Sequence, residues 1–390
     1  MKLLFLSEGP YFEYYQGAAK ANRALLESLV ALGYECRVIH LIDQSSSLSE
    51  VASIMEQQGA DSVIKSTHYI KGTVDGVEIL FTSSYLQVYR MIKESLKQFS
   101  PDVVMVNMSY HTLVAAAIKA GAGSGSKLIA ICHDVLTIPF GPSCWIENPL
   151  LREELNQITS FIGVSDYVAD YIVRWGNYHN VVSLQFPIYG EESYPFFHNF
   201  NRGYIGICNP TAIKGFSIFT QLAEAFPKYS FAAVITWGSL LESEWSKLRE
   251  LPNVTLLNPE HDMNLIFENI RVWLHPSLCQ EALGQTVIEA MLRGIPVLAS
   301  DQGGLIQAKC NVDYNLPVSP IVQIIKDQYT GNTLPVIPEQ NITVWAETLD
   351  KILTDESLYV DISYKSRMAA HKFISGIGPE KFDAYLTGLI

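Results

Sequence analysis

Two glutamates, Glu281 and Glu289, stand on either side of a short glycine turn, eight positions apart. The helical pattern over 286–293 places Gly284 near a helix N-terminus, where unpaired amides and positive potential suit a diphosphate. A glycine there also lets the backbone approach an anion closely. Glu289 lies further along this helix and can accept hydrogen bonds from a vicinal diol such as a ribose. Glu281 lies in the preceding loop, nearer to a sugar beyond the diphosphate. The pattern predicts a sugar-nucleotide site.

A buried strand must precede this loop. Residues 271–274 are apolar enough for such a strand, and Pro276 and Ser277 end it. For either glutamate alone, the simpler interpretation is an ordinary strand-loop-helix unit with solvated carboxylates.

The whole stretch 275–304, HPSLCQEALGQTVIEAMLRGIPVLASDQGG, favours the functional interpretation. It resembles the E-x7-E motif of the family 4 retaining glycosyltransferases. In that family the first glutamate contacts the donor sugar, the second contacts the ribose, and the intervening amides hold sugar and phosphate oxygens. The resemblance assigns these roles to Glu281, to Glu289 and to the backbone of Ala282, Leu283, Gly284, Gln285 and Thr286.

A second loop, 209–215 with the sequence NPTAIKG, also follows a predicted strand and opens a helix. Lys214 can point its ammonium at an anion there, although a lysine at such a place is usually just solvated. The family carries a Lys-Gly pair at this point, and its lysine binds the donor diphosphate. Many members also carry an arginine about five residues earlier, where this chain has Asn209. An asparagine donates a hydrogen bond but brings no charge, so leaving-group stabilisation rests more on Lys214 and the helix N-terminus.

Two further residues match the family in the first half of the chain. His133 and the following Asp134 close a predicted strand and resemble the family's His-Asp pair, whose histidine contacts the donor hexose. The alternative is a structural histidine that satisfies local hydrogen bonds. Gly17 resembles the second position of the family's glycine loop, which admits the diphosphate and the acceptor. That loop usually holds a Gly-Gly pair, whereas Gln16 precedes the glycine here.

Two other segments have less specific patterns. The aromatic residues of the loop after the first strand form either a stacking platform for an acceptor sugar or ordinary packing, and the sequence leaves both open. They are Tyr11, Phe12, Tyr14 and Tyr15. The glycine-rich run 121–125 follows a helix and precedes a strand, which is the reverse of a dinucleotide loop and predicts a turn.

Composition excludes several function classes. With 48% hydrophobic and 17% charged residues the chain is a packed globular protein, and 390 residues predict two domains. A net charge of −13 argues against a nucleic-acid partner and allows at most weak peripheral membrane contact. There is no DxD triplet and no spacing typical of metal ligands, so we expect neither a metal nor a cofactor.

The cellular location is predicted from what the sequence lacks. The apolar run at the N-terminus is too short for a signal peptide, and no segment reaches the ~20 apolar residues of a membrane span. Six cysteines without a CxxC pair are typical of buried thiols in a reducing compartment. We therefore expect a cytoplasmic protein.

Strand and helix patterns alternate along the chain, which predicts an α/β fold with parallel sheets. The proline- and aromatic-rich segment 185–202 interrupts this alternation as a linker. We expect an N-terminal Rossmann-like domain over 1–190 on the acceptor side and a C-terminal Rossmann-like domain over 203–371 that binds the nucleotide sugar. Two doubly wound domains imply a cleft at the carboxyl ends of their strands. The resemblance makes this the GT-B fold, whose C-terminal helix, about 372–390 here, packs back on the first domain.

The resemblance implies a retaining glycosyltransferase. It would move a hexose from a nucleotide diphosphate sugar, expected to be a UDP-sugar, to a hydroxyl of a carbohydrate or a lipid-linked saccharide in polysaccharide or glycoconjugate synthesis. His133 and Glu281 would orient the sugar, and Lys214 would stabilise the leaving group. One alternative is a non-catalytic protein that binds nucleotide sugars or carbohydrates, because of Asn209 and the incomplete glycine loop. Another is a GT-B sugar-nucleotide epimerase, which would need further acid and base groups around the sugar.

Overall fold

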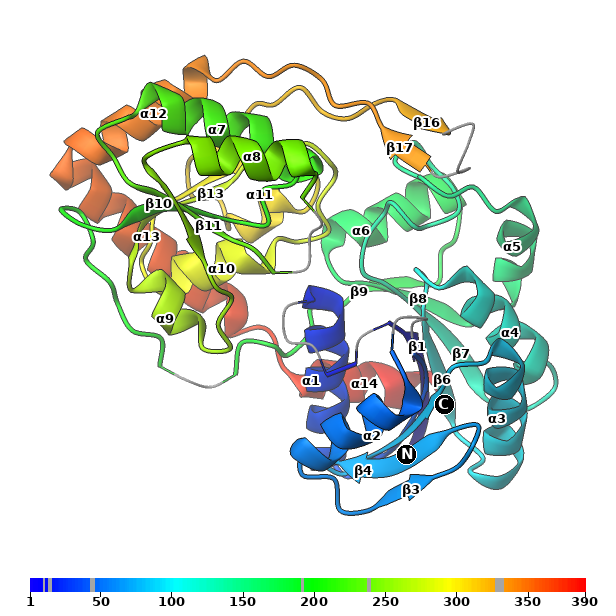
Figure 1. Ribbon diagram of the computed structural model, residues 1–390. Coiled ribbons are helices and arrows are strands. Elements are labelled where there is room, and N and C mark those ends of the chain that lie inside the picture. Colours follow the sequence, from blue (N-terminus) through cyan, green and yellow to red (C-terminus); the bar gives the residue numbers. More distant parts are fainter. Residues whose placement is uncertain (10, 13–15, 43–45, 191–192, 237–239, 327–332) are drawn as a thin grey trace. The chain divides into compact units, whose positions relative to one another are not determined.

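The chain forms two compact α/β units in a computed structural model that describes residues 1–9, 11–12, 16–42, 46–190, 193–236, 240–326 and 333–390 (Figure 1). The first unit comprises Met1–Ile188 together with Ile377–Ile390. The second unit comprises Tyr189–Gly376. The fold is the α/β arrangement with parallel sheets that the alternating sequence pattern predicts.

The sheet of the first unit has the strand order β3-β4-β5-β2-β1-β6-β7-β8-β9. All pairs from β5 to β9 are parallel, whereas β3, β4 and β5 pair antiparallel at one edge. The strict alternation of strand and helix did not predict this antiparallel edge. The strands are β1 (Lys2–Glu8), β2 (Glu35–Leu41), β3 (Val63–Lys65), β4 (Ile70–Val74), β5 (Val77–Thr82), β6 (Val103–Asn107), β7 (Lys127–Cys132), β8 (Ser160–Gly163) and β9 (Val181–Ser183).

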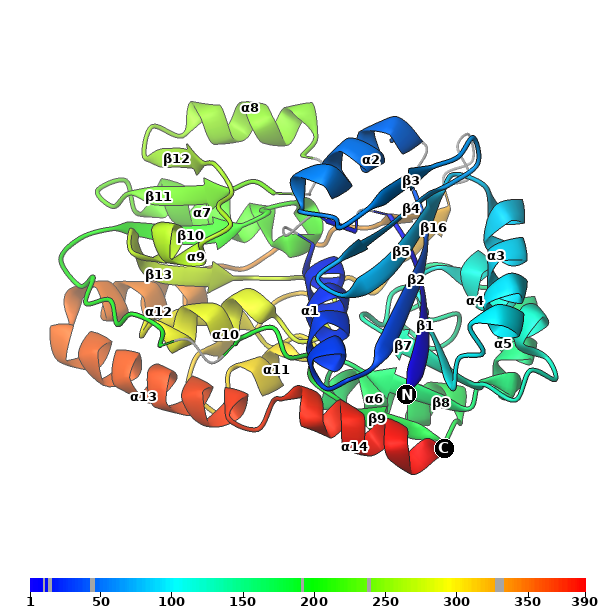
Figure 2. The same ribbon diagram turned by 90° about the horizontal axis from the view of Figure 1, so that it is seen from below.

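Helices cover both faces of this sheet, with α1 and α14 on one face and α3 and α4 on the other (Figure 2). The last helix, α14, packs through Phe382 against Phe186, with ring centroids 5.1 Å apart. The Tyr34 hydroxyl also donates to the carboxylate of Asp383 at 2.7 Å. The helices are α1 (Gly17–Ala31), α2 (Leu48–Gln57), α3 (Tyr85–Gln98), α4 (His111–Gly121), α5 (Pro149–Glu154), α6 (Asp166–Tyr171) and α14 (Pro379–Leu389), with short 3-10 and π turns at Leu155–Gln157 and Ile172–Gly176.

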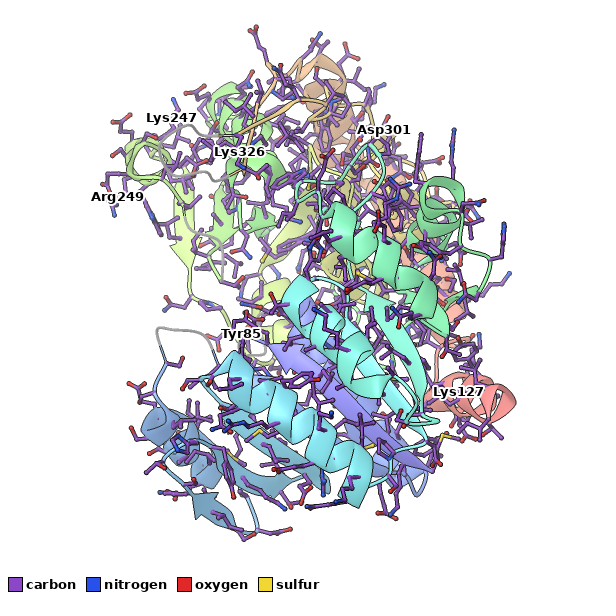
Figure 3. The ribbon with its side chains drawn as sticks, turned by 90° about the vertical axis from the view of Figure 1, so that its right-hand side faces the viewer. Tyr85, Lys127, Lys247, Arg249, Asp301 and Lys326 are labelled. Carbon is purple, nitrogen blue, oxygen red and sulfur yellow. The ribbon has the colours of Figure 1, made fainter. Side chains whose placement is uncertain are left out.

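The two ends of the first sheet differ in what they carry. Tyr85 opens α3 after β5, Lys127 opens β7, and the two lie at opposite ends of the sheet (Figure 3). Tyr85 donates its hydroxyl to Glu8 at the end of β1, at 3.1 Å. Gly17 and His133 follow β1 and β7, so both lie at the carboxyl edge of the sheet, where ligands bind in such folds.

The sheet of the second unit is parallel throughout, with the order β12-β11-β10-β13-β14-β15. Helices α7, α8 and α12 cover one face, and α9, α10 and α13 cover the other (Figure 1). The strands are β10 (Tyr204–Cys208), β11 (Phe231–Val234), β12 (Val254–Leu257), β13 (Ile270–His275), β14 (Val297–Ser300) and β15 (Asn315–Leu316), and β16 (Ile324–Lys326) pairs antiparallel with β17 (Thr333–Pro335). The helices are the 3-10 turn Ala212–Lys214, α7 (Phe216–Ala225), α8 (Glu242–Glu250), α9 (Met263–Phe267), α10 (Gln285–Leu292), α11 (Leu305–Ala308), α12 (Thr343–Thr354) and α13 (Glu356–Ile374).

The strand order of the second unit positions the two loops that the sequence singled out. β10 and β13 are neighbours and run parallel, so the loops after them emerge side by side at the carboxyl edge. A core of apolar side chains from both strands and from α7 and α12 fixes the strands beneath these loops, with Val272, Leu274 and Trp345 fully buried.

Candidate active site

The loops after β10 and β13 are joined by close backbone contacts in the second unit. The amide of Leu278 donates to the carbonyl of Ile213 at 2.9 Å. Gly215 has a φ of 85°, and a Cβ at this position would collide with the carbonyl of Pro276. Only glycine therefore fits without displacing one of the loops, and the close approach places Lys214 beside the loop of Glu281.

Lys214 and Glu281 form an ion pair at the centre of this site. The Lys214 ammonium donates to Oε1 of Glu281, and their side chains are 20% and 11% exposed. The Ser277 hydroxyl donates to the same oxygen at 2.5 Å, and Nε2 of His275 lies 3.4 Å from it. Three groups therefore converge on the same carboxylate oxygen of Glu281. Ser277 and His275 stand within the motif, but its pattern did not indicate this role for them.

The electrostatics of the pair keep both groups ionised. Burial raises the pKa of the Glu281 carboxyl, but Lys214 and His275 outweigh burial and hold that pKa well below its usual range. Burial lowers the pKa of Lys214, and the Glu281 carboxylate more than compensates, so its pKa lies above the usual value. Glu281 is thus a permanent hydrogen-bond acceptor and not a proton donor at neutral pH.

The segment that should hold phosphate and sugar oxygens lies between Glu281 and α10. Gly284 caps α10 without a side-chain hydrogen bond, and Leu283 is buried. The amide of Gly304 donates to the carbonyl of Glu281 at 2.7 Å, and a Cβ on Gly304 would collide with the carbonyl of Ala282. Gly304 therefore holds the backbone of Glu281 and Ala282 in place.

The side chains at the start of α10 face the strand. The Thr286 hydroxyl lies 3.4 Å from Nδ1 of His275 and 3.4 Å from Nε1 of Trp273, so it braces the end of β13. Gln285 is the first residue of α10, and its backbone belongs to the helix N-terminus.

Glu289 lies on α10 with only 7% of its surface exposed, so it is not a solvated carboxylate. Burial raises the pKa of the Cys208 thiol to about 11, with Glu289 adding to the shift and Lys214 opposing it, which places this thiol near both residues. Burial raises the pKa of Tyr189, and the negative charge of Glu289 adds to this shift. Within the described part of the chain the buried Tyr189 hydroxyl has no hydrogen-bond partner. The sequence pattern did not indicate Tyr189.

Asn209 has a structural role that its sequence position did not indicate. Its amide nitrogen donates to the hydroxyl of Thr236 at 2.5 Å, and its amide oxygen accepts from the Thr236 backbone at 2.7 Å. Asn209 is 5% exposed and has a φ of 49°. These bonds tie the ends of β10 and β11 together through one N–H and the oxygen of the Asn209 amide.

His133 and Gly17 are the candidate residues of the first unit. Nε2 of His133 lies 2.7 Å from Oδ1 of Asn22, and burial lowers the pKa of His133 to about 4, so the ring is neutral at physiological pH. Gly17 is the first residue of α1, which begins after Gln16 without a side-chain cap. The first turn of α1 carries no acidic residue.

The described residues of the aromatic loop, Tyr11 and Phe12, pack against neighbouring rings of the first unit. Tyr11 is 8% exposed and makes edge contacts with His40 and Phe81, with centroids 5.6 and 5.9 Å away. Phe12 packs against Phe81 as well, at 5.7 Å. Tyr14 and Tyr15 lie outside the described residues.

Three other predictions concern groups elsewhere in the chain. No cluster of three or more histidine, cysteine, aspartate or glutamate side chains able to hold a metal occurs among the described residues. All six cysteines are free thiols, of which three are buried and three are half-buried. Every helix in the described ranges is too short or too polar to span a bilayer.

The two doubly wound α/β units have the fold of solved glycosyltransferases of the GT-B class. The model of Glycosyltransferase Family 4 matches residues 15–183, and that of Glycosyl transferases group 1 matches residues 203–355. The chain therefore belongs to the family 4 type of glycosyltransferases, as its E-x7-E motif indicated.

Individual relatives are distant. The capsular polysaccharide biosynthesis glycosyltransferase CapM of Staphylococcus aureus is 25% identical over 192 residues, which are 48% of this chain and 45% of CapM, so the match spans less than half of that relative. A glycosyltransferase from Rickettsia africae superimposes with a TM-score of 0.68 at 12% identity, covering 100% of this chain and 98% of the other. Anabaena HepE, solved with UDP and glucose, gives a TM-score of 0.66 at 14% identity and full coverage of both chains. These structures establish the fold.

Proposed function

We propose that this glycosyltransferase is a retaining enzyme that moves a hexose from a uridine diphosphate sugar to a hydroxyl of a saccharide acceptor. The observation that carries the proposal is the arrangement around Glu281. Lys214, Ser277 and His275 all contact Oε1, so the carboxylate is fixed and Oε2 can accept hydrogen bonds from two adjacent sugar hydroxyls.

Lys214 can bind the diphosphate leaving group while it keeps its hydrogen bond to Glu281. An ammonium has three N–H donors, and Glu281 uses one of them, so the others can donate to diphosphate oxygens. The backbone from Ala282 to Gly284 and the first amides of α10 add further donors and the positive end of the helix dipole. Glu289 and the Tyr189 hydroxyl would accept from and donate to the ribose hydroxyls.

The proposed reaction keeps the configuration of the sugar. The acceptor oxygen forms its bond to the anomeric carbon on the face from which the diphosphate leaves, and the bond from that carbon to the phosphate oxygen breaks. The acceptor proton passes to the departing phosphate oxygen, so no enzymic nucleophile is needed. His133 would orient the hexose, and Gly17 would leave room for the acceptor. Charge on the diphosphate is met by Lys214 and backbone amides, so the proposal requires no metal and no cofactor.

The choice of a uridine donor and a saccharide acceptor rests on the relatives. HepE was solved with UDP and glucose, and CapM is named for capsular polysaccharide biosynthesis. We infer that this chain acts in polysaccharide or glycoconjugate synthesis on a carbohydrate or lipid-linked saccharide, with at most weak peripheral contact with a membrane, and that it works in the cytoplasm.

The proposal is tested by measuring sugar transfer and the anomeric configuration of the product. Nucleotide sugars are first screened for thermal stabilisation, since ligand at about a hundred times its dissociation constant adds ~2.7 kcal/mol of stability. The donors that bind are then incubated with mono- and oligosaccharide acceptors, and released UDP and the anomeric configuration of the product are measured. The expected product has the anomeric configuration of the donor. An inverted product refutes the retaining mechanism.

Binding without turnover across the acceptor panel would favour a different function. A non-catalytic protein that binds nucleotide sugars is the second candidate, because Asn209 stands where many family members carry an arginine and brings no charge, so Lys214 is the cation on these two loops. A Lys214→Met variant distinguishes an active glycosyltransferase from a non-catalytic binding protein. In an enzyme it lowers the transfer rate far more than the affinity for uridine, whereas in a binding protein no transfer is present to lower.

A further inference from the structure

Two hydrogen bonds connect the core of the second unit to the imidazole of His275. Trp273 and His275 lie two positions apart on β13, so their side chains share one face of the sheet, and Thr286 is the second residue of α10. Nε1 of Trp273 donates to the Thr286 hydroxyl at 3.4 Å, and that hydroxyl lies 3.4 Å from Nδ1 of His275. Trp273 is fully buried, so these bonds start from a fixed point of the core.

The direction of the two bonds determines where the imidazole carries its proton. An indole N–H can only donate, so the Thr286 hydroxyl accepts from Trp273. In the part of the chain that the structure describes, the side chain of Thr286 has no other hydrogen bond, so its own hydrogen points to Nδ1 of His275. Nδ1 therefore accepts a hydrogen bond, and the proton of the ring is on Nε2.

This Nε2–H is a donor that the structure leaves without a hydrogen bond. Nε2 of His275 is buried and has no hydrogen-bond partner among the described residues, although it lies 3.4 Å from Oε1 of Glu281. The Lys214 ammonium and the Ser277 hydroxyl both donate to that oxygen. A buried donor without an acceptor is unfavourable, so a small movement that lets Nε2–H donate to Oε1 would be favoured once Lys214 binds that oxygen less tightly.

We propose that His275 is a positioning residue that donates to Glu281 when a bound diphosphate draws the Lys214 ammonium toward its own oxygens. This proposal rests on the proposed function, in which Lys214 donates to the diphosphate and Glu281 contacts the sugar. The bond from Lys214 to Oε1 lengthens as the ammonium turns to the ligand, and Nε2–H of His275 closes on the same oxygen. Glu281 thus keeps its orientation. Trp273 and Thr286 keep the proton on the nitrogen that lies beside Glu281.

The exchange of partners is tested by ¹⁵N NMR of protein labelled at histidine, with a His275→Gln variant to identify the His275 signals. Without ligand we expect the proton on Nε2 and a bare Nδ1. Addition of UDP should move the Nε2 proton downfield, because its bond to Glu281 shortens. Lys214→Met should give the same shift without any ligand, whereas the control Lys247→Met, which removes an exposed lysine, should give none. A proton on Nδ1, or unchanged His275 signals in Lys214→Met, would overturn the proposal.

The role of the core bonds is tested in the same spectra. Thr286→Val removes the hydroxyl but keeps the shape of the side chain and the backbone amide. It should give a mixture of the two neutral forms of His275, and Thr286→Ser should restore the proton on Nε2 because it restores the hydroxyl. A pure Nε2–H form in Thr286→Val would show that Trp273 and Thr286 do not set the position of the proton.

The effect on Glu281 is measured by calorimetric binding of UDP and of UDP-glucose. His275→Phe should weaken UDP-glucose on the order of tenfold more than UDP, because the carboxylate loses a donor while the diphosphate site keeps Lys214. His275→Gln should retain most of the UDP-glucose affinity, since its side-chain amide can donate in place of Nε2–H. A residue that only supports the fold would weaken both ligands equally, and equal losses in His275→Phe would overturn the proposal.

Two outcomes separate this proposal from the function on which it rests. If neither UDP nor UDP-glucose binds the unmodified protein, the proposed function fails, while the spectra of Lys214→Met still decide whether His275 donates to Glu281. If His275→Phe does not fold, Thr286→Val provides the same comparison of the two ligands, and an unchanged ratio of their affinities there would count against the proposal.

Discussion

Removing either member of the Lys214–Glu281 pair should destabilise the second unit, and by different amounts. Both side chains are mostly buried, at 20% and 11% exposed, so a lost partner leaves an uncompensated charge out of water. Breaking such a pair costs roughly 3–5 kcal/mol. Glu281→Gln should show this full cost, because Lys214 has no other carboxylate among the ion pairs of the described residues. Lys214→Met should cost less, since Ser277 and His275 still contact the remaining carboxylate.

The double variant separates this pairing from general damage. Glu281→Gln with Lys214→Met removes both charges, so its free energy of unfolding should fall by less than the sum of the single changes, by about 0.5–3 kcal/mol. Urea unfolding followed by tryptophan fluorescence reports it, because Trp273 and Trp345 are fully buried in the same unit.

An exposed pair in the same unit provides the matched control. Lys247 and Glu224 are 40% and 47% exposed and also form an ion pair, and removing either should cost at most about 1 kcal/mol. Additive losses for Lys214 and Glu281, or losses no larger than those of this control pair, would refute the view that the two charges depend on each other.

Four further outcomes follow from the structure. Glu289→Ala should weaken the binding of UDP without a sugar by about 1.5–3 kcal/mol in calorimetry, and an unchanged affinity for UDP would exclude Glu289 from the ribose site. Gly304→Ala should lower donor affinity while most of the fold survives, because the new methyl group displaces the Ala282 carbonyl; full affinity would show that the loop tolerates the shift. Lys309 is fully buried, and burial lowers its pKa from 10.5 to about 7, although Asp313 opposes the shift. The unfolded chain then binds more protons between these values, so stability should rise as pH increases from about 7 toward 10, and a Lys309→Met variant with the same rise would contradict this. Transfer activity should persist in excess chelator, and its loss with recovery on added manganese would show that Lys214 and amides do not suffice.

The local elements around the site could be predicted from the sequence. An apolar run predicted a strand over 271–274, which lies within β13, and helical spacing predicted α10 to within one residue. The antiparallel edge of the first sheet also had a signal, since Asp75-Gly76 joins β4 and β5 with positive φ at both residues, as expected for a two-residue hairpin turn. The alternation of strand and helix along the rest of the chain favoured parallel pairing there instead, so this hairpin was not predicted.

The partners of the site residues could not be predicted. Lys214 and Glu281 are 67 positions apart, and Asn209 and Thr236 are 27 apart, so neither pairing follows from spacing. Each depends on which strands are neighbours and on how far their loops extend, which packing decides. The sequence indicated that Asn209 can donate a hydrogen bond, but only the structure shows that its amide bonds to Thr236.

The ion pair at Lys214 also affects how an anionic donor would reach the site. Glu281 cancels the lysine charge before any ligand arrives, and the whole chain carries a net charge of −13. A nucleotide sugar therefore approaches without the long-range attraction that speeds association in many phosphate-binding proteins, and against a weak general repulsion. Salt screens that repulsion, so the association rate should increase with ionic strength where a basic site would show a decrease. Affinity in such a site comes from short-range hydrogen bonds and slow release, and capture is limited by ordinary diffusion.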